Sequence, residues 1–600
     1  MRAMRLTDLA PWRNPGVRAA HPRPRGAACR RARRVTCAAA LGGLLAVAAC
    51  VGAAALTAAA AAPPSLEVAM HALQTGDAAT ATRLLEALTR QPGAPARLWR
   101  LLGSTYQQLH DNRRAISAYR HALALEPDSP QALYGLGSAY AGAKNWPQAW
   151  HWLQRAQATH RFDMSQITED PNLTSVNHDE RFVALLPRAA DFDHPFVEPV
   201  RIIHEWRGEA ANDQFGWIAR NIGDVDGDGV NDLVISAPTH GAAGSHAGRI
   251  YVYSSRDGGL LWSADGAPGD ELGTGVEAAG DTNHDGIPDV IASGPAGRGI
   301  ARIYSGRDGR VLQEFHAENP DEMYGNHSAG AGDVDGDGCA DVIVGSPGKD
   351  GESKTPGHAY VYSGRTGERL LTLAGEHPGD QFGSTVAGFA DGAQRYLIVG
   401  APRGGPTRHG RVYVYAGAAQ ALKFTIEADD TGDALGLMFV SVLGDVDGDG
   451  VSDIFASDWS NAAHGPSTGR IYVHSGRTGE RLLVLTGEGA GDGFGTSVSV
   501  SGDVDGDGRA DLIVGAWQYG QAAVSGGRAY LYSGRDGRLL RHFTDRVAGD
   551  TLGFDAVGLG DIAGDGGAVL LLSAAWSAVH GHHSGRVFAV SALPLRSVAH

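Results

Sequence analysis

Short acidic segments recur between residues 224 and 511. The first reads Asp224-Val-Asp226-Gly-Asp228-Gly-Val-Asn-Asp232, with acids at positions 1, 3, 5 and 9 and glycine at position 6. A hard cation such as Ca²⁺ takes about six to eight oxygen ligands, and the glycine permits the sharp turn that gathers them from one short loop. The spacing therefore predicts five calcium sites. Their candidate ligands are Asp224, Asp226, Asp228, Asp232, Asp281, Asn283, Asp285, Asp289, Asp333, Asp335, Asp337, Asp341, Asp445, Asp447, Asp449, Asp453, Asp503, Asp505, Asp507 and Asp511.

The loop shares its first positions with the EF-hand but differs from it after position 6. An EF-hand has helices on both sides and a glutamate at position 12. Here position 9 leads directly into apolar runs such as Leu233-Val-Ile and Leu512-Ile-Val, without a flanking helical period, and the glutamate is missing. Each loop is therefore expected to lie between two strands.

Every loop belongs to a longer repeated unit. A signature of the type Asp213-Gln-Phe-Gly216 begins each unit, and a strand ending near Ala237-Pro238, an alternating strand such as Tyr251-Val-Tyr253, a Ser-Gly-Arg-type turn and an outer strand come after it. Seven four-stranded units arranged radially describe a mainly β, seven-bladed β-propeller. The seven units begin at Asp213, Asp270, Asp321, Asp380, Asp433, Asp492 and Asp550.

These landmarks resemble the FG-GAP repeats of the integrin α-subunit N-terminal propeller. The resemblance covers roughly residues 198–592 and rests on the Phe-Gly starts, the Ala-Pro strand ends and the acidic loops in combination. It implies that calcium lies on the face opposite ligand binding and stiffens the blades; catalytic or regulatory calcium is the alternative.

Two units and the two ends of the propeller depart from the pattern. Unit four retains only Asp391 of the acidic loop, and unit seven retains Asp561 and Asp565, so neither is expected to bind calcium. Unit seven also lacks a fourth strand. Residues 200–207, which precede the first unit, should supply this strand, because pairing there closes the ring and removes an exposed sheet edge.

Residues 65–190 show a helical period instead. Trp99, Gly103, Tyr106 and Ala115 fit the tetratricopeptide pattern, and residues 133–156 repeat it one period of about 34 residues later. A poorer copy precedes these two. Residues 167–187 resemble the helix that often caps such arrays. The array is interpreted as a groove that binds a peptide or protein, with a simple spacer as the alternative.

The N-terminus resembles an export signal. Residues 1–34 contain ten arginines and one acid, and residues 35–62 form an uncharged, alanine-rich run long enough to span a bilayer. This run is a signal peptide or a membrane anchor that places the remainder outside the cytoplasm. Cys50 stands where a bacterial lipoprotein would be lipidated, although an unmodified cysteine is the alternative. The net charge of −16 disfavours nucleic-acid binding.

Few residues suggest catalysis. Gly465-Pro-Ser467-Thr-Gly469 matches the nucleophile-elbow string but lacks the strand-turn-helix context that an elbow requires. His580-Gly-His582-His583 could bind a transition metal, but a solvated loop is the preferred interpretation, because the sequence shows no further ligand. Tryptophans that replace a recurring proline suggest a stacking surface for sugar or protein, with packing between blades as the alternative. They are Trp459, Trp517 and Trp576.

These patterns predict a non-enzymatic, calcium-stabilised binding, adhesion or scaffold protein outside the cytoplasm. The propeller face would bind a protein or carbohydrate ligand, the helical groove a peptide or protein, and the N-terminal segment the membrane. Two alternatives remain open. One is an envelope assembly or secretion factor that works through the helical groove, and the other is a hydrolase of glycans or phospholipids that uses the propeller as an accessory domain.

Overall fold

The computed structural model describes residues 66–593, except 75, 243, 320–321, 350–353, 392–393 and 418–420. The predicted basic region, the segment 35–62 and Cys50 lie outside the described residues. Within the described part of the chain, no helix combines the length and the apolar character needed to cross a membrane.

The helical part consists of antiparallel pairs. The first pair, α1 (Leu66–Gln74) and α2 (Ala78–Thr89), lies in one compact unit, and the residues from Pro92 onward form a second. In that second unit, Gly103 faces the Tyr119 ring so closely that a Cβ there would lie 2.9 Å from it, which explains why the pattern requires a small residue. The two later pairs are α3 (Ala96–Gln108) with α4 (Asn112–Leu125) and α5 (Pro130–Gly142) with α6 (Trp146–Gln157).

The predicted capping helix is replaced by short turns. Residues 164–192 form η2 (Met164–Thr168), η3 (Thr174–Val176), the single-turn helix α7 (Glu180–Val183) and η4 (Ala189–Phe192). Pro171 and Pro187 interrupt this stretch, and proline cannot donate the backbone hydrogen bond that a continuous helix needs.

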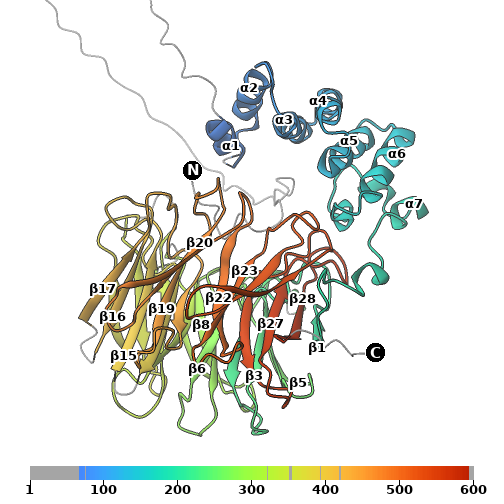
Figure 1. Cartoon of the computed structure of the whole chain (residues 1–600). Coiled ribbons are helices and arrows are strands. Elements are labelled where there is room, and N and C mark those ends of the chain that lie inside the picture. The colour runs from blue at the N-terminus through green and yellow to red at the C-terminus, as the bar shows by residue number, and fades with distance from the viewer. Residues whose placement is uncertain are drawn as a thin grey trace, which may run out of the picture. The chain divides into compact units, whose positions relative to one another are not determined.

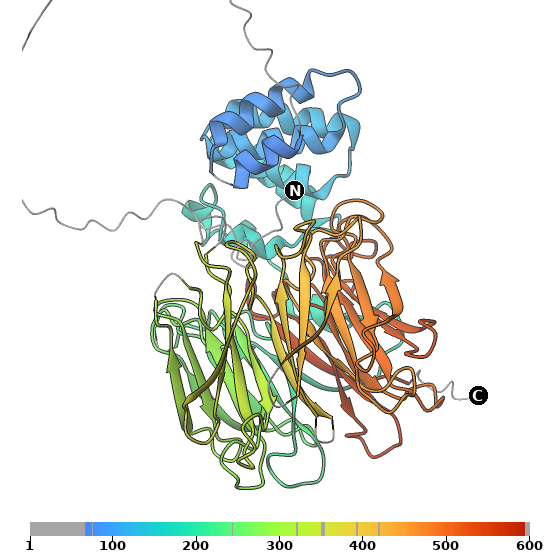
Figure 2. The ribbon, with the colours of Figure 1, turned by 90° about the vertical axis from the view of Figure 1, so that its left-hand side faces the viewer.

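Seven four-stranded antiparallel sheets come next in the chain, and the predicted seven-bladed propeller is confirmed (Figure 2). Blade one consists of β2 (Ala219–Gly223), β3 (Asp232–Ala237), β4 (Arg249–Tyr253) and β5 (Leu260–Asp265), and blade two of β6 (Gly275–Gly280), β7 (Asp289–Gly294), β8 (Ile300–Tyr304) and β9 (Val311–His316). Blade three consists of β10 (Ser328–Gly332), β11 (Asp341–Ser346), β12 (His358–Tyr362) and β13 (Arg369–Ala374). Blade four consists of β14 (Val386–Asp391), β15 (Gln394–Ala401), β16 (Arg411–Ala416) and β17 (Ala421–Glu427).

The last three blades repeat this order with one change. In blade seven, the fourth strand is β1 (Ile202–Arg207), which pairs with the C-terminal strand β28 (Arg586–Ser591), as Figure 1 shows. The clasp predicted for residues 200–207 is therefore confirmed. Blade five consists of β18 (Val440–Leu443), β19 (Asp453–Asp458), β20 (Arg470–His474) and β21 (Arg481–Thr486). Blade six consists of β22 (Phe494–Gly502), β23 (Asp511–Ala516), β24 (Arg528–Tyr532) and β25 (Leu539–Thr544). The other two strands of blade seven are β26 (Ala556–Gly560) and β27 (Val569–Ala574).

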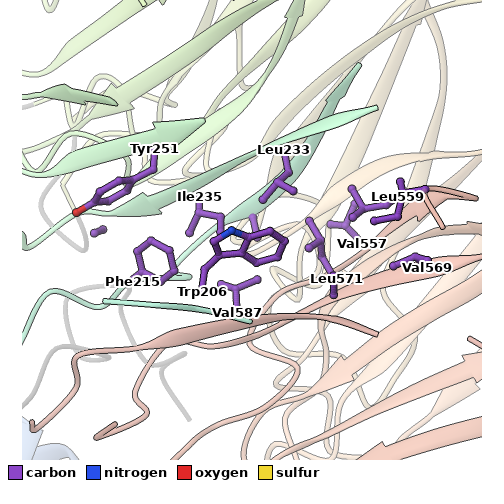
Figure 3. Packing of buried hydrophobic residues seen from close by; sticks show 14 residues of the cluster. Trp206, Phe215, Leu233, Ile235, Tyr251, Val557, Leu559, Val569, Leu571 and Val587 are labelled. Carbon is purple, nitrogen blue, oxygen red and sulfur yellow. The ribbon is translucent and has the colours of Figure 1, made fainter. Parts of the chain in front are cut away.

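The core lies between consecutive blades. The second strands are buried along their whole length in every blade except blade four, where β15 begins with exposed Gln394, because both of their faces are covered. Between blades seven and one, Trp206 packs against Leu233, Ile235, Leu571 and Val587 (Figure 3). Each blade is therefore fixed by its neighbours, and each acidic loop stands between the first two strands of its blade.

Candidate metal sites

The first carboxylate of each loop organises the backbone. Asp224 accepts hydrogen bonds from the backbone N–H groups of Gly227 at 2.7 Å, Asp228 at 3.2 Å and Gly229 at 2.8 Å. Gly229 has a φ of +89°, a left-handed conformation that favours glycine and explains the recurring glycine at position 6. Asp333, Asp445 and Asp503 accept equivalent bonds in their own loops.

The last carboxylate anchors the loop to the blade. Asp232 is fully buried, and one of its oxygens accepts from the Val225 N–H at 2.9 Å while the other accepts from the Ser255 N–H at 3.1 Å. Burial raises the pKa of Asp232 to about 6. A bound divalent cation would favour the ionised form that this environment disfavours.

Carboxylate oxygens from positions 1, 3 and 9 converge in four loops. In each of them, one oxygen from each residue lies within 4.8 Å of the others, which is the donor set that Ca²⁺ prefers. The groups are Asp224, Asp226 and Asp232; Asp333, Asp335 and Asp341; Asp445, Asp447 and Asp453; and Asp503, Asp505 and Asp511.

The second loop carries an amide in place of one acid. The side-chain oxygen and nitrogen of Asn283 are both buried without a hydrogen-bond partner. Such an orphaned amide oxygen fits a hard-cation ligand, because an unmet buried acceptor costs about 1–3 kcal/mol. Asp281, Asp285 and Asp289 complete this loop, and Asp281 accepts from the Gly286 N–H at 2.9 Å as its counterparts do.

The fifth position has a partner that the loop spacing alone does not indicate. Asp228 lies 2.6 Å from Nε of Arg256, and Arg256 also donates to the Asp228 backbone carbonyl at 2.7 Å. Equivalent ion pairs join Asp449 to Arg477 at 2.8 Å and Asp285 to Arg307 at 3.5 Å. This arginine recurs in the Ser-Gly-Arg-type turn of these blades, and its recurrence is the sequence feature from which the ion pair with position 5 could have been predicted.

Blades four and seven lack complete donor sets among the described residues. In blade four, β14 and β15 pair directly up to Asp391 and Gln394. In blade seven, Asp561 still accepts from the Gly566 N–H at 2.9 Å, but Asp565 pairs with Arg201 at 2.6 Å and position 9 is Val569. The loop of blade seven thus keeps the turn without the ligands.

The three tryptophans are packed differently from one another. Trp459 and Trp517 are 3% and 1% exposed, whereas Trp576 is half-buried. Trp517 meets Trp576 edge-on with ring centroids 5.0 Å apart. A ligand can therefore stack only on Trp576 in this conformation, and the burial of the other two favours the packing alternative for them.

One interpretation from the sequence is wrong. The loop 580–583 is not solvated throughout, because His582 and His583 are 4% and 7% exposed.

Cys339, the free cysteine of the propeller, is also buried. Ser467 has a φ of +54° in a loop between two strands, as expected from the missing elbow context.

Family models match both parts of the chain. The FG-GAP repeat matches residues 215–253 and 494–532, and the FG-GAP-like repeat matches residues 281–344. A tetratricopeptide repeat matches residues 106–168. The chain carries FG-GAP repeats and a tetratricopeptide repeat. The FG-GAP matches fall on blades one, two, three and six, each across an acidic loop.

The FG-GAP propeller is similar to integrin α-subunits. Integrin alpha-PS3 of Drosophila melanogaster is 33% identical over 161 residues, which cover 24% of this chain and 14% of that protein. Integrin alpha-5 of Xenopus laevis is 27% identical over 242 residues, or 36% of this chain and 22% of that protein. The chain thus spans less than a quarter of the length of these relatives.

Among solved structures, BBS1N in its complex with ARL6DN is similar over 66% of this chain and 98% of that chain. The TM-score is 0.40 and the sequence identity is 12%.

Proposed function

We propose that this chain is a calcium-stabilised binding protein, an adhesion or scaffold component that acts outside the cytoplasm. The observation that supports this most directly is the convergence of three carboxylates in each of four FG-GAP loops. Asp281, Asn283, Asp285 and Asp289 would hold a fifth ion. The chain would use its propeller face to bind a protein or carbohydrate, with Trp576 as the accessible aromatic contact.

Calcium would act by holding the loop and the blade in one geometry. In blade one, Asp232 at position 9 is anchored to the turn that follows the third strand through the Ser255 N–H. The ion would join Asp232 to Asp224 and Asp226, at positions 1 and 3 of the same loop. Loops of modest affinity, with Kd on the order of 10⁻⁴ to 10⁻³ M, bind calcium only where it is abundant. This requirement supports a location outside the cytoplasm.

The helical repeats would supply the second contact surface. A hollow of about 420 Å³ lies on α4 and is lined by Arg113, Ile116, Ser117, Arg120 and His121. Arg113 and Arg120 lie about two turns apart on one face of α4, and Arg120 also donates to the Tyr140 hydroxyl at 2.5 Å. Positive charge along this face favours an acidic peptide. The same observation supports the second candidate, an assembly or secretion factor that works through these repeats.

Calcium stoichiometry tests the central part of the proposal. Isothermal titration of the full chain should show five ions. At 10 mM calcium, each site with the affinities above should add about 1.4 to 2.7 kcal/mol to the free energy of unfolding of the structure it stabilises. Asp453→Asn should remove one ion, whereas Asp561→Asn, in the blade-seven loop that lacks acids at positions 3 and 9, should remove none. Equal stoichiometry in wild type and Asp453→Asn would refute the assignment.

Binding and location are tested separately. Capture of partners from an envelope extract, in calcium or in chelator, should depend on calcium for wild type and weaken in Trp576→Ala. Identical recovery in all conditions would argue against the propeller as the binding element. N-terminal sequencing of the mature protein would show whether residues 35–62 are removed and whether Cys50 is lipidated.

A further inference from the structure

A buried cluster of one carboxylate and two imidazoles lies away from the acidic loops. It consists of Asp163, which precedes η2, and His582 and His583 of blade seven. These residues are 7%, 4% and 7% exposed. One ligand atom from each lies within 4.8 Å of the others, and Nδ1 of His582 is 3.7 Å from Oδ2 of Asp163.

Local structure holds the three side chains in place. The Ser165 backbone N–H and hydroxyl donate to Oδ1 of Asp163 at 2.9 and 2.6 Å, so that this oxygen caps η2. The His583 ring stacks on Trp576 with centroids 5.0 Å apart, and the two histidine rings stack at 3.6 Å. These contacts leave Oδ2 of Asp163 and Nδ1 of His583 unused, and one histidine ring has to turn out of the stack before both rings can hold one ion in their planes.

These two atoms are buried and have no hydrogen-bond partner. A buried carboxylate oxygen and a buried imidazole nitrogen without partners are costly, and a divalent cation that both atoms coordinate would offset that cost.

The histidine pair is a departure from the repeat. The same loop carries Ser245-His246 in blade one, Pro466-Ser467 in blade five and Val524-Ser525 in blade six, each with a glycine two residues later. The backbone conformation is shared, because His246, Ser525 and His583 all have a φ of 50° or 51°. The paired histidines stand in the blade whose loop meets Asp163.

We propose that Asp163, His582 and His583 bind a divalent transition metal of the Zn²⁺ class. The metal would join the segment after the helical repeats to blade seven. Tetrahedral Zn²⁺ bonds N and O ligands at about 2.0–2.2 Å, which places them about 3.3–3.5 Å apart. The pair of His582 Nδ1 and Asp163 Oδ2, at 3.7 Å, needs only a small contraction, and water would be the fourth ligand. His582 would exchange its 2.8 Å contact with the Ser165 hydroxyl for the metal.

The identity of the metal follows from the donor set and the burial. Two nitrogens and one oxygen suit zinc better than calcium, which prefers oxygen alone. Two histidines and a carboxylate also hold iron(II) in oxygenases, but those sites keep open positions. All three ligands here are buried, which limits the access of a substrate to the ion and favours a structural role. This proposal is independent of calcium in the acidic loops.

Zinc titration of the full chain tests the proposal. Calcium in large excess occupies the acidic loops, and Zn²⁺ is then added in competition with a chromophoric chelator. Wild type should bind one Zn²⁺, and Asp163→Asn and His583→Gln should each weaken binding at least about 100-fold, since loss of even a supporting residue costs about 10- to 100-fold. His246→Gln, the same loop position in blade one, should bind as wild type does.

Any of three results would overturn the proposal. The first is the absence of zinc binding in calcium-saturated wild type, and the second is unchanged affinity in His583→Gln. Because a variant could fail to fold, Co²⁺ is added to wild type as a second measurement. The visible absorption of tetrahedral Co²⁺ with nitrogen ligands is expected, and its absence would overturn the proposal without any variant.

Discussion

Trp206 should be the residue on which ring closure depends most. Its side chain is 7% exposed between blades seven and one, and its Nε1 donates to the Gly258 carbonyl at 3.0 Å. Burying about 200 Å² at about 25 cal/mol/Å² gives about 5 kcal/mol. This figure is an upper bound, because the unfolded chain already buries part of that area. Trp206→Ala should therefore lower the free energy of unfolding by about 3–5 kcal/mol.

The repeat provides a matched control for this change. Trp262 on β5 makes the same contact one blade later, where its Nε1 donates to the Gly306 carbonyl at 2.7 Å, but it is half-buried and joins blades that the chain already links in sequence. Urea denaturation in excess calcium should show a smaller loss for Trp262→Ala. A loss below about 1 kcal/mol for Trp206→Ala, or equal losses for both variants, would refute the reasoning.

Three further predictions concern single buried groups. Burial and the charge of Arg220 lower the pKa of His327 from 6.5 to about 4. Between pH 6.5 and pH 4 the histidine is therefore protonated in the unfolded chain but not in the folded one, so its contribution to the free energy of unfolding falls as the pH drops below 6.5. The loss from pH 7 to pH 5 should be about 2 kcal/mol, and His327→Asn should abolish it in urea titrations at the two pH values. Arg586 is fully buried, and its Nε donates to a carboxylate oxygen of Asp550 at 3.0 Å. Arg586→Met should lower the free energy of unfolding by about 3–5 kcal/mol, because it leaves the buried Asp550 without its partner. A thermal midpoint equal to that of wild type would contradict this prediction. Cys339 donates its backbone N–H to Asp337 at 2.9 Å inside the third acidic loop, so calcium that stabilises this loop should keep the buried thiol from a thiol reagent. In 10 mM calcium the reaction, measured by mass spectrometry on the peptide that contains Cys339, should be about 10- to 100-fold slower than in chelator. Equal rates in calcium and in chelator would show that this loop does not bind the ion.

Much of the propeller could be predicted because its information is local and repeated. Each unit contains its own start, acidic loop and strand-ending residues within one stretch of sequence, so the blade of β2 to β5 could be recognised without knowledge of the others. The one long-range pairing that was predicted, β1 with β28, came from a missing strand in the last unit. An unmatched sheet edge has few stable solutions.

The site could be predicted only in part. The spacing of Asp224, Asp226 and Asp232 indicated their convergence, but it did not show that Asp228 would pair with Arg256, because that arginine lies on a different turn. The exposure of Trp517 depends on how the neighbouring blade packs, which the repeat does not encode. Asp163 and His582 are far apart in the chain, and no local period connects them.

The pairing of β1 with β28 determines when the propeller can be finished during synthesis. The propeller strand that leaves the ribosome first pairs with the one that leaves it last, so the ring stays open until the entire domain has been translated. The helical repeats, whose contacts are local, can fold long before that moment. An open sheet edge on the nascent chain invites wrong pairing. Delayed closure therefore leaves the edges of β1 and β27 unpaired until β28 has been made, and slow translation prolongs this exposure.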